Sequence, residues 1–116
     1  MFAFMNITRA LSDENRIRIL AALEDRELCV CQLIEMLQLS PSTVSKHLSI
    51  LRNARLLNAR KEGRWMHYRL ATPPRSAMVS DAIDWVLRSI GDDEQVQADR
   101  EFVAAIPLGA GAVKCG

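Results

Sequence analysis

The segment from residue 40 to residue 70 constrains the fold most, because a capped helix is followed at once by two short strands. Ser40 offers a capping hydroxyl, and Pro41 stands at the first helical position, where its missing N–H costs nothing. The helix predicted from this start runs to about Ala54. Its inward face carries three apolar residues at helical spacing, Val44, Leu48 and Leu51.

Two strands are predicted next, from Leu56 to Glu62 and from Arg64 to Leu70, around a Glu62-Gly63 turn. In the second strand, apolar Met66, Tyr68 and Leu70 alternate with Trp65, His67 and Arg69, so one face can be buried. An isolated hairpin is barely stable in water. We therefore expect this hairpin to lean against the helices.

Charge is distributed unevenly along the chain. Residues 41–75 hold eight Lys and Arg side chains against Glu62 alone, a net +7, which leaves −6 for the rest of a chain whose total is +1. A basic block inside a folded segment is what contact with nucleic-acid phosphates requires. A solvated surface face is the plainer interpretation of the same charges.

The predicted helix carries a second stripe of small hydroxyls and one lysine opposite its apolar face. Such a stripe packs poorly but suits the major groove, where Ser and Thr can bond base edges or phosphates. The basic hairpin could grip phosphate or minor groove, or its charges could simply keep a surface hairpin soluble. His47 could contact DNA or pack between helices, and His67 is interpreted as a hairpin residue. The residues predicted to contact DNA are Ser42, Thr43, Ser45, Lys46, His47, Ser49, Arg52, Arg60, Lys61 and Arg64.

Further helices are predicted on both sides of this segment. The first covers about Phe2 to Leu11, and the second begins after a cap at Ser12 or Asp13. The third lies around Val30 to Leu37 and stops near Gln38. A last helix, capped by Ser76, has a broad apolar stripe that either covers its own core or is buried against a twin. The stripe comprises Val79, Ala82, Ile83, Val86, Leu87 and Ile90, with Met78 and Trp85 beside it.

These elements predict a mainly α fold with a small β-hairpin, a winged helix-turn-helix that dimerises through its first and last helices. Residues 1–90 would form this domain. Residues 91–116 would be a tail that is first acidic and weakly helical to Ile106, then rich in Gly and Ala and mobile.

Other classes of protein fit the sequence poorly. No apolar run approaches the ~20 residues of a membrane span, and the opening apolar residues are too few for a signal peptide, so we expect a cytoplasmic protein. An enzyme, for example a thiol reductase or an arsenate-processing protein, is also not expected. The chain has neither a phosphate loop nor a C-x-x-C beside a βαβ pattern.

The three cysteines, Cys29, Cys31 and Cys115, are an odd number that argues for thiol chemistry rather than a disulfide framework. With Val30 facing the core, Cys29 and Cys31 would each lie about 100° from it on an ideal helix. One ion binding both thiolates would then distort the first turn, where backbone N–H groups have no helical partner. Helix N-termini also favour the thiolate form that metals and arsenic require. A plain buried thiol is the alternative.

Four segments resemble the ArsR/SmtB family of metal-responsive repressors. They are Leu11 to Leu20 (LSDENRIRIL), Glu27 to Leu33 (ELCVCQL), Ser45 to Arg52 (SKHLSILR) and Glu62 to Tyr68 (EGRWMHY). The resemblance implies a homodimer built on the first and last helices. It also implies a repressor that binds a near-palindromic operator of double-stranded DNA and leaves it when an inducer binds.

Departures from the family pattern bear on the inducer. Arsenical repressors often carry a third cysteine where this chain has Ile34, and the last helix offers Asp81 and Asp84 without the histidine of the family's zinc site. As(III) favours three sulfurs, so Cys115 becomes a candidate third ligand from its own or the partner subunit. The predicted inducer is As(III) or Sb(III), bound by Cys29, Cys31 and Cys115. Cd(II), Pb(II) or Zn(II) comes second, and a thiol redox switch at the cysteine pair is a further alternative.

Overall fold

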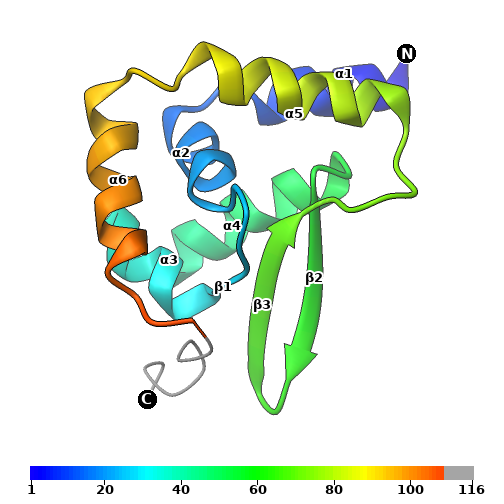
Figure 1. The fold of residues 1–116 in the computed structure, drawn as a ribbon. Helices are drawn as coiled ribbons and strands as arrows, with labels where there is room; N and C mark the ends of the chain where they lie inside the picture. The colour runs from blue at the N-terminus through cyan, green and yellow to red at the C-terminus, as the bar shows by residue number, and fades with distance from the viewer. Residues whose placement is uncertain (109–116) are drawn as a thin grey trace.

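The computed structural model describes residues 1–108, and over these residues helices dominate around one small sheet (Figure 1). Its elements in chain order are α1 (Phe2–Ala10), α2 (Glu14–Ala22), β1 (Leu28–Cys29), α3 (Val30–Leu37), α4 (Pro41–Asn53), β2 (Leu57–Glu62), β3 (Trp65–Leu70), α5 (Ala77–Ser89) and α6 (Glu94–Ala104).

The helices begin where short polar side chains can cap them. Asp13 accepts hydrogen bonds from the backbone N–H groups of Asn15 and Arg16, and Ser40 and Ser76 accept from the third residue of α4 and α5. These three caps are among those expected from the sequence. The predicted bounds of α1, α3, α4 and the two hairpin strands lie within one or two residues of the observed ones.

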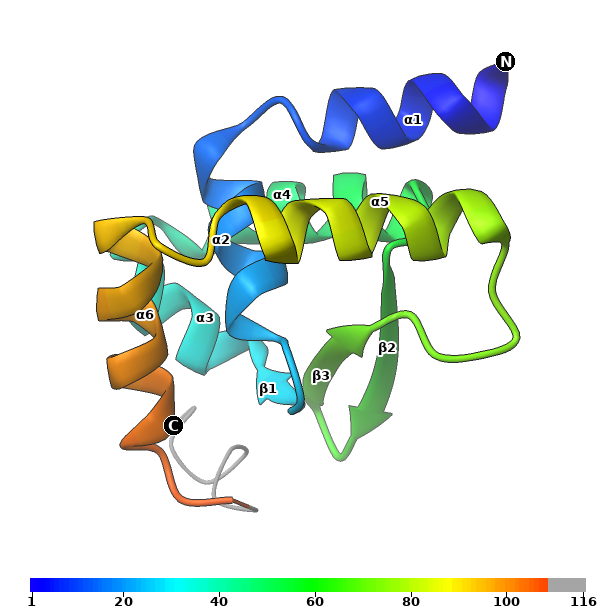
Figure 2. The ribbon, with the colours of Figure 1, turned by 45° about the horizontal axis from the view of Figure 1, so that its top comes forward.

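The core lies where α2, α3 and α4 meet. Leu20, Leu33 and Leu48 are essentially inaccessible to solvent and belong to one continuous apolar cluster. In Figure 2, α1 and α5 run side by side along one edge of the molecule, and α6 stands against α2 and α3 at one end. This arrangement leaves one face of α4 and the β2–β3 hairpin uncovered.

The sheet has three strands rather than the two expected. The order is β1-β3-β2 with antiparallel pairing, and Leu28 and Cys29 of β1 pair with Tyr68 and His67 of β3. Two residues are too short a pattern to be recognised as a strand in the sequence. The β2–β3 hairpin, called the wing below, turns at Gly63, whose φ of +62° favours glycine.

The predicted alternation in β3 is wrong at His67, which was placed on the exposed face but is only 6% exposed. The added strand β1 pairs with β3 here and places the buried Cys29 directly opposite His67. The ring also lies near two carboxylates, with Nδ1 3.8 Å from Glu27 and Nε2 3.4 Å from Glu62. Tyr68, on the predicted inner face, is buried as expected.

The last two helices differ in what they cover. In α5 the residues Val79, Ile83 and Val86 pack into the chain's own core, whereas Met78 and Trp85 remain 42% and 58% exposed. α6, expected to be only weakly helical, is a regular helix that packs against α2 and α3. Residues 94–104 are therefore held against the body of the protein.

Candidate DNA-binding face and cysteine site

The predicted hydroxyl-and-lysine stripe of α4 faces solvent. Val44, Leu48 and Leu51 anchor the opposite face of the helix in the core. The exposed predicted residues of this helix are Ser42, Thr43, Ser45, Lys46, Ser49 and Arg52. Near the N-terminus of the helix, the Oγ1 of Thr43 lies 2.8 Å from the Oγ of Ser40, which links two hydroxyls of this face.

His47 differs from its neighbours because it is half-buried. Its Nδ1 lies 3.1 Å from Nη1 of Arg16, a residue buried to 9% exposure that also donates through Nε to the carbonyl of Ala10. His47 thus takes part in helix packing, the second of the two roles considered for it. Sequence reasoning overlooked Arg16, because a buried arginine has no periodic signature.

The three predicted basic residues of the wing have different surroundings. Lys61 and Arg64 are exposed, and the Arg64 guanidinium lies 5.4 Å from the ring centroid of Trp65. Arg60 is exposed too, but it forms an ion pair with Glu27, which accepts from Nε at 2.9 Å and lies 2.6 Å from Nη2. The hydrogen bond from Arg60 lowers the pKa of Glu27, with added attraction from Arg60 and His67.

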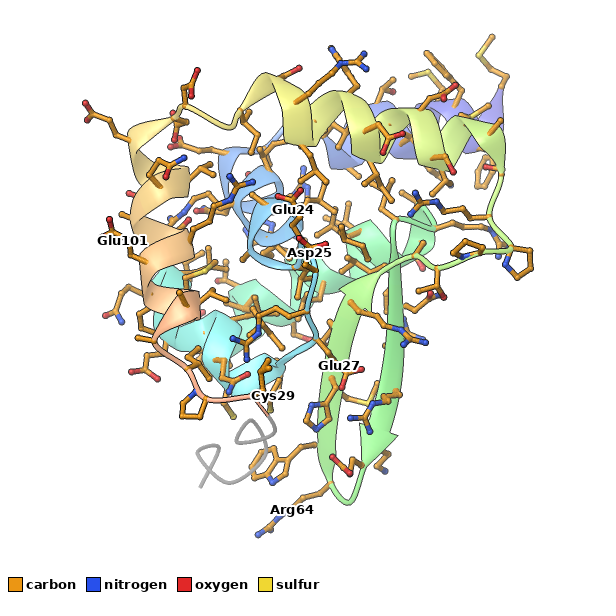
Figure 3. All side chains as sticks on the ribbon, viewed as in Figure 1. Glu24, Asp25, Glu27, Cys29, Arg64 and Glu101 are labelled. Atoms are coloured by element: carbon orange, nitrogen blue, oxygen red, sulfur yellow. The ribbon has the colours of Figure 1, made fainter. Side chains whose placement is uncertain are left out.

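Cys29 and Cys31 lie at the junction of β1 and α3. Figure 3 shows the position of Cys29. The expected geometry is wrong in one respect, since Cys29 is the N-cap residue with extended backbone angles and not part of the helix. Val30 packs against the core as expected but is only half-buried, like Cys31, whereas Cys29 is completely buried. The Cys29 backbone N–H donates to Oε1 of Gln32 at 2.9 Å, which fixes this junction.

Among the residues that the structure describes, the other candidate ligands do not gather around this pair. Within residues 1–108 no three His, Cys, Asp or Glu side chains are placed to hold a metal ion. Asp81 and Asp84 lie exposed on α5, and Cys115 lies outside the described residues. No helix in the described part of the chain has the length and apolar character needed to cross a membrane.

Arg26 ties the end of α6 to the segment that leads into the cysteines. Its Nη1 donates to the carbonyls of Val103 at 2.9 Å and Ile106 at 3.1 Å. Arg26 stands three residues before Cys29 in the sequence. The C-terminal end of α6 is consequently held beside the approach to the cysteine site, a contact that no local sequence pattern predicts.

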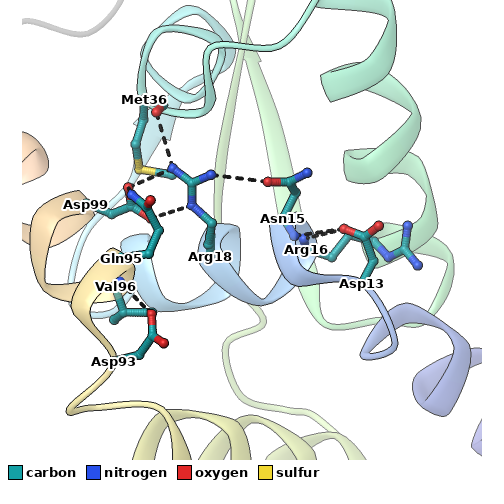
Figure 4. Close-up of polar contacts among 9 residues, drawn as sticks. All are labelled: Asp13, Asn15, Arg16, Arg18, Met36, Asp93, Gln95, Val96 and Asp99. Carbon is teal, nitrogen blue, oxygen red and sulfur yellow. Dashed lines mark hydrogen bonds and ion pairs between the residues drawn. The ribbon is translucent and has the colours of Figure 1, made fainter.

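A second arginine holds the middle of α6 (Figure 4). Arg18 of α2 donates through Nε and Nη2 to the two carboxylate oxygens of Asp99 at 2.8 and 2.9 Å. Both side chains are largely buried, and the hydrogen bond to Asp99 raises the pKa of Arg18. Paired buried charges of this kind fix the position of one helix on another.

A helix with an exposed hydroxyl-and-lysine face, packed after another helix and followed by a basic antiparallel hairpin, defines a winged helix-turn-helix DNA-binding protein. The model of the family described as "Bacterial regulatory protein, arsR family" matches residues 13–59. The chain is similar to the arsenical resistance operon repressor of Escherichia coli, with 40% identity over 81% of this chain and 79% of that protein.

Solved structures agree with this assignment. HlyU from Vibrio cholerae shares 36% identity with a TM-score of 0.64, covering 75% of this chain and 90% of that chain. The cadmium sensor CMTR from Mycobacterium tuberculosis shares 38% identity with a TM-score of 0.52, covering 80% and 84%. The chain belongs to the ArsR family and is a transcriptional repressor of this family, not an enzyme.

Proposed function

We propose that this repressor leaves its operator when As(III) or Sb(III) binds the thiolates of Cys29 and Cys31. The observation that carries the proposal is the place of the two cysteines, at the start of a helix that packs directly on α4. The similar E. coli protein is a repressor of arsenical resistance. An ion that draws both sulfurs together acts on α3 and, through it, on the DNA-facing helix.

The residues present suit a thiol-seeking ion. Thiolate sulfur is the donor that soft ions select. Because Cys29 has extended backbone angles and Cys31 lies in the first turn, the two sulfurs can approach one ion by rotation at the N-cap, and the remaining turns of α3 stay intact. The completely buried Cys29 must move to become a ligand, which couples binding to a change in shape.

Cys115 of the same chain is proposed as the third sulfur. Beyond the end of α6, the carbonyl of Ile106 accepts a hydrogen bond from Arg26, which stands three residues before Cys29. Cys115 stands seven residues after Leu108, a span of up to about 24 Å when extended. That length is sufficient to return to α3 from the end of α6.

The operator is proposed to be contacted by α4 and the wing. The exposed hydroxyls and Lys46 of α4 are suited to the major groove, and Lys61 and Arg64 to backbone phosphates. His47 is the weakest member of the predicted set because Arg16 already occupies its Nδ1.

The repressor is further proposed to act as a cytoplasmic homodimer through α1 and α5. Phe4 and Trp85 line a groove of about 660 Å³ between these helices, and Phe2, Met5 and Met78 are also exposed along them. Exposed apolar side chains gathered along two adjacent helices are typical of a protein interface. A twofold dimer would present two α4 helices to a near-palindromic operator.

The proposal is tested by fluorescence-anisotropy titration of DNA from upstream of the protein's own gene, with arsenite, Cd(II) and Zn(II) added under reducing conditions. We expect arsenite to release the wild-type protein, and Cys29→Ser/Cys31→Ser to bind DNA and ignore arsenite. If Cys115→Ser stays bound to DNA when arsenite is added, the tail thiol belongs to the site. If arsenite releases this variant as readily as wild type, the site is confined to Cys29 and Cys31.

A cadmium-type inducer is the second candidate, favoured by the likeness to the cadmium sensor CMTR. If only Cd(II) or Zn(II) releases the DNA, the inducer is a divalent metal ion and not arsenic. If no ion acts but peroxide releases the DNA, the thiol redox switch becomes the function of the cysteine pair.

A further inference from the structure

A single cross-strand row links the cysteine site to the wing. Cys29 of β1 is directly opposite His67 of β3, and His67 is directly opposite Arg60 of β2. Neighbouring strands lie about 4.8 Å apart, so the backbone of Cys29 is only about 10 Å from that of Arg60. The buried cysteine and a basic residue of the wing therefore belong to one short, continuous piece of sheet.

Glu27 adds a side-chain link between the cysteine end of this row and the wing. It stands two residues before Cys29, and its carboxylate bridges the strands by accepting from Arg60 Nε at 2.9 Å through both oxygens. The same carboxylate lies 3.8 Å from Nδ1 of His67. Glu62, near the tip of the wing, adds contacts at 3.4 Å to His67 Nε2 and at 3.6 Å to Arg60 Nη1.

Packing makes this row able to transmit movement. Cys29 is completely buried and His67 is 6% exposed, so neither can shift without displacing its neighbours. Within residues 1–108, Nε2 of His67 is buried without a hydrogen-bond partner, so the strands and the nearby carboxylates position the ring. A displacement of β1 therefore reaches β3 and the wing directly.

We infer that Glu27 and Arg60 are positioning residues that transmit inducer binding at Cys29 to the wing. The inference rests on the proposed function and adds a route that bypasses α3. With Cys29 buried, the Glu27–Arg60 pair holds the wing in its DNA-binding position. When ligation draws Cys29 out, β1 carries Glu27 with it, Arg60 follows, and the wing moves relative to α4.

The test uses Glu27→Gln, which keeps the size of the side chain and removes its charge. Arsenite binding is measured by calorimetry under a non-thiol reductant, and operator affinity is measured with and without arsenite. We expect arsenite affinity to match wild type, while the fold-loss of operator affinity on adding arsenite shrinks roughly threefold, the size of effect that a partly exposed ion pair supports.

The matched control is Glu24→Gln, three residues earlier, whose carboxylate pairs with Arg100 at 2.6 Å outside the row. This variant should respond to arsenite like wild type. An unchanged response in Glu27→Gln, or an equal decrease in Glu24→Gln, would overturn the inference and leave the proposed function intact. A wild-type protein that binds DNA but ignores arsenite would overturn both.

Discussion

Three arginines hold elements of this structure together. Arg16 and Arg26 donate to backbone carbonyls at the ends of α1 and α6, and Arg18 donates to Asp99. A count of basic residues therefore overstates the charge that can contact phosphate, unless the basic residues paired within the protein are left out of the count. On the wing, the same distinction separates Arg60, which is paired with Glu27, from the exposed Lys61.

Lys46→Ala and Ser45→Ala should weaken operator binding without unfolding the protein, because both side chains are exposed on α4. Loss of one phosphate contact by Lys46 should lower the slope of log affinity against log salt by about 1. Loss of one hydrogen bond by Ser45 should cost about 1 kcal/mol. Anisotropy titrations at several salt concentrations measure both, and Arg100→Ala on α6, outside both α4 and the α1–α5 groove, is the control. Wild-type affinity in both variants would refute the assignment of α4.

Asp99→Asn should lower the free energy of unfolding by about 3 kcal/mol, because it leaves the guanidinium of Arg18 without a counter-charge in a largely buried position. Glu24→Gln removes a more exposed ion pair with Arg100 and should cost less than about 1 kcal/mol. Urea denaturation compares the two variants. Equal losses would mean that the buried pair contributes no more than a surface one.

Residues whose role is local could be predicted from the sequence. The caps at Ser40 and Ser76 depend only on the next three residues, and the outward stripe of α4 follows from helical periodicity. The burial of His67 and Cys29 could not be predicted, because it arises from a strand pair between segments far apart in the chain.

At the scale of elements, the two-residue strand β1 has the largest effect for its length. It extends the wing into a three-stranded sheet and places the cysteines at the sheet's edge. The five helices and two strands with strong periodicity or caps were predictable. The regular form of α6 was not, since it owes its stability to Arg18, Arg26 and packing on α2 and α3.

The Glu27–Arg60 link should make part of the stability dependent on pH. The pKa of Glu27 in the folded protein is lowered, so its contribution is complete above the ordinary glutamate pKa. It is then lost as the pH falls through the lower, folded-state pKa. The difference in unfolding free energy between wild type and Glu27→Gln should therefore shrink on acidification from neutral pH. Denaturation curves over this range check it, and a difference that does not change with pH would contradict it.

At the scale of the whole molecule, the edge formed by α1 and α5 carries most of the exposed large apolar side chains of residues 1–108. Trp85→Glu should yield a monomer, as measured by analytical ultracentrifugation. It should also lower operator affinity by at least about a hundredfold through loss of bivalent binding. Leu108→Glu is the control, because Leu108 is an 83% exposed apolar residue outside that groove. A dimeric Trp85→Glu would refute this interface.

The burial of Cys29 should also limit how fast the protein responds to arsenite. Arsenite needs the sulfur of the completely buried Cys29, which becomes available only when the junction of β1 and α3 opens. Local opening has its own rate, so at high arsenite the rate of DNA release should level off instead of rising with concentration. Stopped-flow anisotropy would show this plateau. A repressor built this way disregards brief exposure and responds to arsenite that persists longer than the opening time.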